Sequence, residues 1–339
     1  MTISSSAVCC GCCAPNAWKM PNEKPALVQE HESKGRRLTL EDGQSIFVRD
    51  EGRQQDDTVH QQKTVVMIHG VPASSLLYRK FFDPLTKQHG YRAIAVDLPG
   101  LGFSDKPLDR DYSWPAMAKT LEEVLHHKDL GLVVSGKKTK KKNLHLVIHD
   151  IGGPIGALYA AEHPDQVASI TVLDTLFDIE TFQKPFPMFF FPMPIIGTIA
   201  IKTFTPWIVR QFMHMRGVQD KSSCDHEEAM AWVWQLKNNQ GSATFSKIMK
   251  SFPRQKDDKK QLTAKIKQVL GEKEKIPMQI VWAAGEVAIP TYQRQYIQDN
   301  FNVQHVHEVA GRHFFQLESA GEIVDHIHNF LQEQQKGAK

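Results

Sequence analysis

The chain has 339 residues and a formal net charge of +3, from 41 basic and 38 acidic residues. This length suits one α/β domain with an inserted segment. The small net charge does not imply binding to nucleic acid, and nothing in the composition indicates an oligomeric state.

Residues 1–35 are expected to form a disordered tail that carries most of the cysteines. Four of the five stand together at Cys9, Cys10, Cys12 and Cys13. The body of the chain keeps only Cys224, so structural disulfides are not expected, and a cytoplasmic, reducing location fits. The tail has no apolar segment of the signal-peptide type. Its cysteines could be S-acylated, which would attach the chain to a membrane, or could bind a soft metal; a plain disordered tail is the preferred interpretation.

Two apolar strands in the first half of the chain run into Gly/Pro-rich turns. The strand predicted at 64–68 is followed at 69–72 by the sequence His-Gly-Val-Pro. A backbone N–H in such a loop, here that of Val71, can take part in an oxyanion hole. The strand predicted at 93–96 ends in Asp97, which is expected to be structural.

Asp150 is the most informative residue of the sequence. It ends an apolar strand predicted at 144–149, and Gly152 and Gly153 lead from it into a helix-forming stretch at 154–161. A strand, a sharp turn and a helix form the geometry of a nucleophile elbow, in which the turn lifts one side chain clear of the sheet. A carboxylate there is a nucleophile without any base, and it can attack saturated carbon to form an ester. The alternative is an Asp that caps the following helix.

His313 stands between a strand predicted at 303–310 and an amphipathic helix predicted at 320–331. A His in this loop can deprotonate the water that attacks an ester. The oxygen that becomes charged in that attack would be held by the N–H groups of Val71 and Ile151.

These four motifs, in this order, resemble those of the α/β-hydrolase superfamily, in its Asp-nucleophile branch of haloalkane dehalogenases and epoxide hydrolases. The later motifs are Asp-x-Pro-Gly-x-Gly-x-Ser-Asp at 97–105, His-Asp-x-Gly-Gly at 149–153 and His-Phe at 313–314. A stretch at 232–241 is also similar to the mesoderm-specific-transcript group of the same branch.

The resemblance implies a mostly parallel sheet flanked by helices, with an inserted helical cap. The hydrolase core is expected at 36–176 and 277–335, and the cap at 177–276. The resemblance implies neither a cofactor nor a metal ion.

The acid that orients His313 has two candidates, because the family places it after either of two strands. After the strand predicted at 277–282, Glu286 stands where Asp is usual. Asp174 ends the strand predicted at 169–173, at the spacing from the elbow that some dehalogenases use. Asp174 is the preferred candidate, and one of the two should hold the His313 imidazole in the right tautomer.

The family's usual devices for stabilising a leaving group are missing. Ile151 and Val71 occupy positions at which dehalogenases carry Trp and Asn side chains, and residues 177–276 contain no Tyr. The cap side chains that could donate instead are Trp207, His214, Trp232 and Trp234. Each of these is also a candidate for ordinary core packing.

The first part of the expected cap, at 185–201, is strongly apolar, with prolines that argue against a membrane-spanning helix. It is expected to be a lid over an apolar pocket or a patch that contacts a membrane surface.

The sequence therefore predicts a hydrolase that forms a covalent ester on Asp150 with a small or medium apolar substrate, which water then cleaves. The first alternative is an epoxide hydrolase with an unusual acid. The second is a catalytically silent hydrolase fold that binds a ligand or partner through its cap.

Overall fold

The computed structural model of the protein describes residues 23–54, 62–132, 142–184, 188 and 191–336. The Cys9 to Cys13 cluster lies outside these residues. Among them, no helix has the length and the apolar character needed to cross a bilayer.

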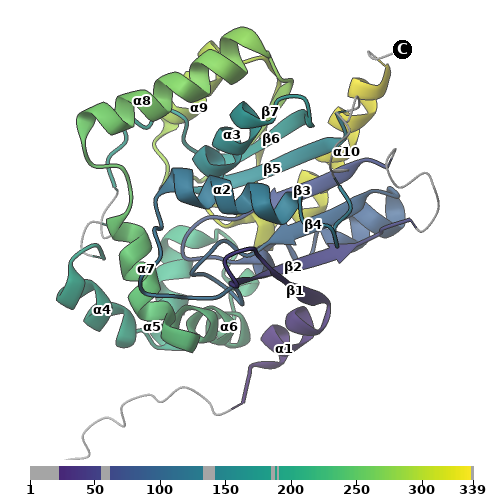
Figure 1. Cartoon of the computed structure of the whole chain (residues 1–339). Coiled ribbons are helices and arrows are strands. Elements are labelled where there is room, and N and C mark those ends of the chain that lie inside the picture. The colour runs from purple at the N-terminus through teal and green to yellow at the C-terminus, as the bar shows by residue number, and fades with distance from the viewer. Residues whose placement is uncertain (1–22, 55–61, 133–141, 185–187, 189–190, 337–339) are drawn as a thin grey trace, which may run out of the picture.

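An eight-stranded sheet forms the centre of the molecule (Figure 1). Its strands are β1 (Gly35–Thr39), β2 (Ser45–Glu51), β3 (Thr64–Ile68), β4 (Arg92–Val96), β5 (Leu144–Asp150), β6 (Val167–Thr175), β7 (Met278–Ala283) and β8 (Val303–Val309). They follow the order β1-β2-β4-β3-β5-β6-β7-β8. The pairs β1–β2 and β2–β4 are antiparallel, and all later pairs are parallel. The expected mostly parallel sheet is confirmed.

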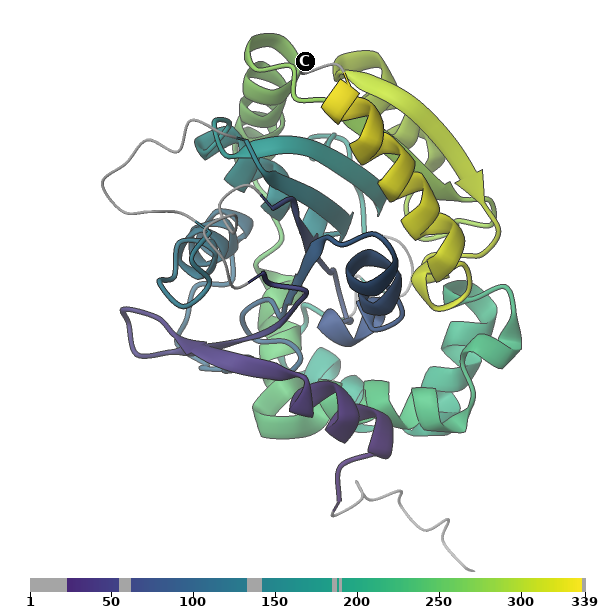
Figure 2. The ribbon, with the colours of Figure 1, turned by 90° about the vertical axis from the view of Figure 1, so that its right-hand side faces the viewer.

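Helices cover both faces of this sheet, so its central strands are apolar on both sides. Val66 and Ile68 of β3 join the core shared with α2 (Trp114–Leu125), α3 (Gly152–Glu162) and α9 (Thr291–Asn300). Val65 and Met67, which point the other way, join the core shared with α10 (Ala320–Lys336). Figure 2 shows α10 lying across its face of the sheet.

The cap covers the edge of the sheet at which the parallel strands end (Figure 1). It is built from α4 (Pro194–Lys202), α5 (Pro206–Phe212), α6 (His226–Lys237) and α7 (Gly241–Lys250). The expected boundary at residue 276 is too late, because α8 (Lys256–Ile266) packs against α3 of the core. Ile266, the last residue of α8, is buried in the hydrophobic core, and this burial holds the otherwise charged helix against the core.

The expected disordered tail also ends earlier than residue 35, because helix α1 (Ala26–Ser33) is folded against the core. Val28 is fully buried, and His31 is 2% exposed. Arg49 donates to His31 Nδ1 at 3.3 Å, so the ring carries its proton on Nε2 and donates it to Ser75 Oγ at 2.8 Å. Burial, aided by the charge of Arg49, lowers the pKa of His31 to about 3 and keeps the ring neutral.

A pair of truncations separates this helix from the residues before it. Deleting residues 1–22 is expected to leave the melting temperature unchanged. Deleting residues 1–33 also removes buried Val28 and the His31 hydrogen bonds, which should lower the free energy of unfolding by at least about 2 kcal/mol. Urea unfolding of the two proteins measures the difference; equal stability would contradict the packing of α1.

Candidate active site

Asp150 sits on a sharp turn between β5 and α3. Its φ of 51° is left-handed, a conformation that costs a non-glycine residue on the order of 1–3 kcal/mol. The turn needs small neighbours: a Cβ on Gly152 would lie 2.4 Å from the Ile68 carbonyl oxygen, and one on Gly153 would lie 1.7 Å from Thr175 Oγ1. Thr175 Oγ1 in turn donates to the Asp150 carbonyl oxygen. The structure therefore has the strand, turn and helix of an elbow, with Asp150 at its apex.

The turn after β3 brings a backbone donor to the Asp150 carboxylate. Val71 N–H donates to Asp150 Oδ1 at 2.8 Å. A Cβ on Gly70 would lie 2.1 Å from the same oxygen, so only glycine permits this approach. Buried His69 fixes the turn, because its Nε2 accepts from Leu98 N–H at 3.0 Å while its Nδ1 donates to the Gly70 carbonyl oxygen at 2.7 Å.

The second proposed oxyanion donor, the N–H of Ile151, belongs to the residue that begins the turn into α3. Ile151 is 1% exposed and lines the same cavity as Asp150. Of the sequence-predicted pair, Val71 N–H thus contacts the carboxylate, while Ile151 lies beside Asp150 in the cavity wall and its N–H stays a proposed second donor.

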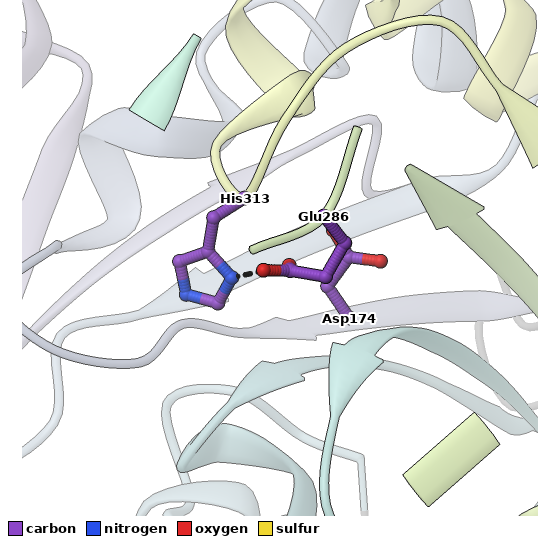
Figure 3. Close-up of side chains that lie close together, drawn as sticks. All are labelled: Asp174, Glu286 and His313. Carbon is purple, nitrogen blue, oxygen red and sulfur yellow. Dashed lines mark hydrogen bonds and ion pairs between the residues drawn. The ribbon is translucent and has the colours of Figure 1, made fainter. Parts of the chain in front are cut away.

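His313 lies between the Asp150 carboxylate and a second carboxylate. Its Nε2 is 3.6 Å from Asp150 Oδ2, and its Nδ1 donates to Glu286 Oε2 at 2.6 Å. Figure 3 shows the hydrogen bond to Glu286. His149 holds the loop that carries His313, because its Nε2 donates to the His313 carbonyl oxygen at 2.8 Å.

The acid that contacts His313 is therefore Glu286, against our preference for Asp174. Asp174 Oδ1 accepts from Ala283 N–H at 2.9 Å, and its side chain lies behind Glu286 in Figure 3. The loop after β7 carries Glu286 over the end of β6, and the longer Glu side chain reaches the imidazole. Spacing along the sequence does not reveal this path.

The two acids share a proton. Burial and the negative charge of Glu286 hold the pKa of Asp174 well above its usual range, so Asp174 is neutral. Asp174 Oδ2 accepts no hydrogen bond from a described residue, and Glu286 is the neighbouring carboxylate to which its proton can be donated. Burial opposes the charge on Glu286, but His313 and this hydrogen bond lower the pKa of Glu286 to about 2.

The charges on the other two groups follow from the same contacts. Burial opposes the charged form of Asp150, but the neighbouring His313 and the Val71 N–H hold the pKa of Asp150 below its usual value. Burial also opposes protonation of His313, but Glu286 and Asp150 hold the pKa of His313 well above its usual range. Asp150 is therefore ionised without the help of a base, as a nucleophile requires.

Asp174, Glu286 and His313 also place one potential ligand atom each within 4.8 Å of the others, as a metal site would. The direct 2.6 Å contact between His313 and Glu286 leaves no room for a cation between them. A shared proton and a hydrogen bond account for all three groups.

A cavity of about 370 Å³ opens above Asp150 and His313. Its other lining residues come mainly from the cap and are almost all apolar. Of the four cap donors suggested by the sequence, only Trp232 lines the cavity, and its indole N–H donates to Glu228 at 2.9 Å. Trp207 is 66% exposed, Trp234 packs in a separate cluster with Phe103, and His214 Nε2 donates to the Cys224 carbonyl oxygen at 2.8 Å.

Arg216 is the cavity residue that the sequence did not reveal. It belongs to a π-helical turn, η5 (Met213–Gly217), and is the one Lys or Arg among the residues that line the cavity. Its Nη1 donates to the Val287 carbonyl oxygen at 3.4 Å, and no carboxylate of the described residues forms an ion pair with it. No motif marks Arg216; the available signal was the absence of any Asp or Glu from 181–219.

Substitution of each acid separates their roles without any substrate. Glu286→Gln removes the negative charge beside His313, so the His313 pKa should fall. Asp174→Asn should leave it high, because the amide NH₂ can donate to Glu286 as the protonated carboxyl does. NMR titration of the His313 ring measures both; a larger fall in Asp174→Asn than in Glu286→Gln would contradict the shared proton.

Comparison with known proteins agrees with this geometry. A family model described as the alpha/beta hydrolase fold matches residues 63–320. The chain is 27% identical over 277 residues to a cis-3-alkyl-4-alkyloxetan-2-one decarboxylase of Shewanella oneidensis, covering 80% of this chain and 83% of that protein. It is 32% identical over 163 residues to a haloalkane dehalogenase of Psychrobacter cryohalolentis, covering 47% of this chain and 48% of that protein.

Solved structures show the same fold. The unliganded epoxide hydrolase CorEH superposes with a TM-score of 0.70 at 20% identity, over 88% of this chain and 98% of that one. The family match, the elbow and the sheet lead to one conclusion: this chain is a member of the α/β-hydrolase family of enzymes, with a haloalkane dehalogenase and an alkyloxetanone decarboxylase among its relatives.

Proposed function

We propose that this hydrolase attacks an electrophilic carbon of an apolar substrate with Asp150 and forms a covalent ester. The observation that carries the proposal is that the two oxygens of the Asp150 carboxylate have different neighbours. Oδ1 receives the Val71 N–H, while Oδ2 lies 3.6 Å from His313 Nε2 at the base of the cavity. Oδ2 is thus the attacking oxygen, and Oδ1 becomes the ester carbonyl oxygen, already held by a donor.

The first step needs no proton. Asp150 Oδ2 forms a bond to the substrate carbon, and the bond from that carbon to its leaving group breaks with its electron pair. The apolar cavity suits a small or medium alkyl substrate and removes water from the carboxylate, which strengthens its attack.

The second step needs His313 as a base. Ester formation removes the charge of Asp150, which is one of the two charges that keep His313 protonated. The pKa of His313 then falls, so its Nε2 releases its proton to solvent and can take a proton from the attacking water while Glu286 holds Nδ1. The water oxygen attacks the ester carbonyl carbon, and the oxyanion forms on Oδ1 beside Val71. Collapse breaks the bond from the acyl carbon to Oδ2, and protonated His313 gives its proton to the departing oxygen. The products are an alcohol, a proton and the Asp150 carboxylate, which now contains the oxygen of water.

The need to stabilise the leaving group distinguishes epoxides from substrates whose leaving group is stable by itself. Among the cavity-lining residues, no Tyr is available to protonate an epoxide oxygen, and the Trp232 N–H is already bonded to Glu228. A substrate that carries its own stabilised leaving group avoids this deficit. An alkyl-substituted oxetan-2-one, the type of compound named for the Shewanella relative, is therefore the second candidate.

The chemistry of that candidate balances without water. Asp150 Oδ2 attacks the saturated, alkyl-bearing ring carbon that is bonded to the ring oxygen. The bond from this carbon to the ring oxygen breaks, which leaves a carboxylate on the substrate. The carboxylate is then lost as CO₂, the released electron pair forms a carbon–carbon double bond, and Asp150 departs as its carboxylate. Arg216 is the cavity cation able to pair with the substrate carboxylate before CO₂ is lost.

His313→Ala distinguishes the two candidates in one experiment. With a 1-haloalkane, the variant should form the ester and stall, so that intact-mass measurement shows an alkyl adduct on the Asp150 peptide. With a cis-3,4-dialkyl oxetan-2-one, the variant should still release alkene and CO₂, because no base is needed. Asp150→Ala is the control and should be inactive with both; turnover in that control, or an adduct on another residue, would refute the proposed nucleophile.

The two steps should respond differently to acid. Asp150 has a lowered pKa, so ester formation should continue until the pH falls below the usual carboxyl range. Ester hydrolysis requires neutral His313 and should fall about tenfold per pH unit below the pKa of His313 in the ester form. Rapid-quench mass spectrometry should therefore find the ester accumulating in mild acid and not in mild base. Parallel loss of both steps on acidification would contradict this assignment.

A further inference from the structure

One face of the cap combines exposed apolar side chains with unpaired positive charge. Residues 181–219 contain no Asp or Glu. Besides Lys184, the Lys and Arg residues of this segment are Lys202 at the end of α4, Arg210 in α5 and Arg216 after α5. None of these three forms an ion pair with a described carboxylate. This segment therefore contributes positive charge and no negative charge of its own, although the net charge of the whole chain is small.

The same segment concentrates the large apolar side chains that the described part of the chain exposes. Nine such side chains are at least 36% exposed, and five of them fall between residues 193 and 215. They are Met193 (40%), Ile199 (56%), Trp207 (66%), Ile208 (36%) and Met215 (62%). Scattered exposure of single apolar residues is ordinary, but this clustering is not.

The patch borders the cavity. Ala200, Ile208 and Phe212, which line the cavity, belong to α4 and α5, the helices that also carry the exposed residues. Ala200 and Phe212 are partly exposed and Ile208 is 36% exposed, whereas Asp150 and Ile151 at the cavity's base are buried. Figure 1 shows α4 and α5 at the outer side of the cap, away from the sheet. The wall of the cavity that α4 and α5 form thus adjoins the patch.

We propose that the α4–α5 face, defined by Met193, Ile199, Lys202, Trp207, Arg210 and Met215, docks on an anionic lipid bilayer. An exposed Trp among aliphatic side chains suits the boundary between head groups and acyl chains. Unpaired Lys and Arg side chains beside them favour a negatively charged membrane surface over a neutral one. The absence of acidic side chains from the segment removes the repulsion that such a surface would otherwise meet.

Docking in this orientation places the α4–α5 wall of the cavity against the lipid. An apolar substrate dissolved in the bilayer would then reach Asp150 without crossing water. The docking surface does not rest on the proposed chemistry, since none of its six residues contacts Asp150, His313 or Glu286 through a hydrogen bond or ion pair.

Vesicle flotation tests the surface with the full-length chain made in bacteria, where its cysteines are not acylated. Vesicles of phosphatidylcholine alone are compared with vesicles that also contain phosphatidylserine. The wild type should bind the anionic vesicles preferentially. Ile199→Ser combined with Trp207→Ser should weaken binding by roughly tenfold or more, and Lys202→Glu should weaken only the preference for anionic lipid.

The matched control combines Leu108→Ser with Val306→Ser, two residues exposed to a similar extent (41% and 42%) outside the cap. This control should bind as the wild type does. Melting curves verify that each variant is folded, and Met215→Ser serves as a second, independent probe of the patch. The proposal is wrong if the wild type ignores anionic vesicles or if the control loses binding equally. It is also wrong if the double variant changes only the oligomeric state measured by light scattering, because the face would then bind a second copy of the chain.

Discussion

The buried negative charge of Asp150 is the constraint on which the rest of the site depends. A carboxylate that is 5% exposed is costly to ionise unless donors surround it. Val71 N–H donates to the carboxylate, and the positive charge of His313 lies 3.6 Å from it. Each requires its own support: Gly70 and His69 shape the first turn, and Glu286 orients His313. The left-handed backbone at Asp150 adds strain. The close packing at Gly152 and Gly153, which follow it, keeps the backbone in this conformation.

The neutral state of Asp174 follows from the same constraint, because a buried site can hold only a few negative charges. Two ionised acids behind one imidazole would repel each other in a dry interior. Protonating the deeper acid leaves one charge on Glu286, beside His313, and one on Asp150. The imidazole therefore lies between two anions in the resting protein and between one anion and an ester after the first step. In the mechanism we propose, this loss of one negative charge lowers the pKa of His313 and so favours its neutral, basic form.

The parts of the site that could be predicted from sequence are those formed by contiguous residues. The strand, Asp150 and two glycines define their own turn, and His-Gly-Val-Pro defines the position of the Val71 N–H. The choice between Asp174 and Glu286 could not be made, because it depends on how the loop after β7 crosses the end of β6. Trp207 and Trp232 look alike in sequence, but helix packing exposes the first and buries the second. Helix α1 is short and only weakly apolar, so Val28 and His31 gave no periodic signal.

The central claim, that the oxygen delivered to the substrate comes from Asp150, is tested most directly by a single turnover in H₂¹⁸O. With protein in excess over a 1-haloalkane, the first alcohol formed should contain ordinary oxygen, and the Asp150 peptide should gain one ¹⁸O atom. An alcohol that carries ¹⁸O from the first turnover, with an unlabelled Asp150, would show that water attacks the substrate directly and would contradict the account.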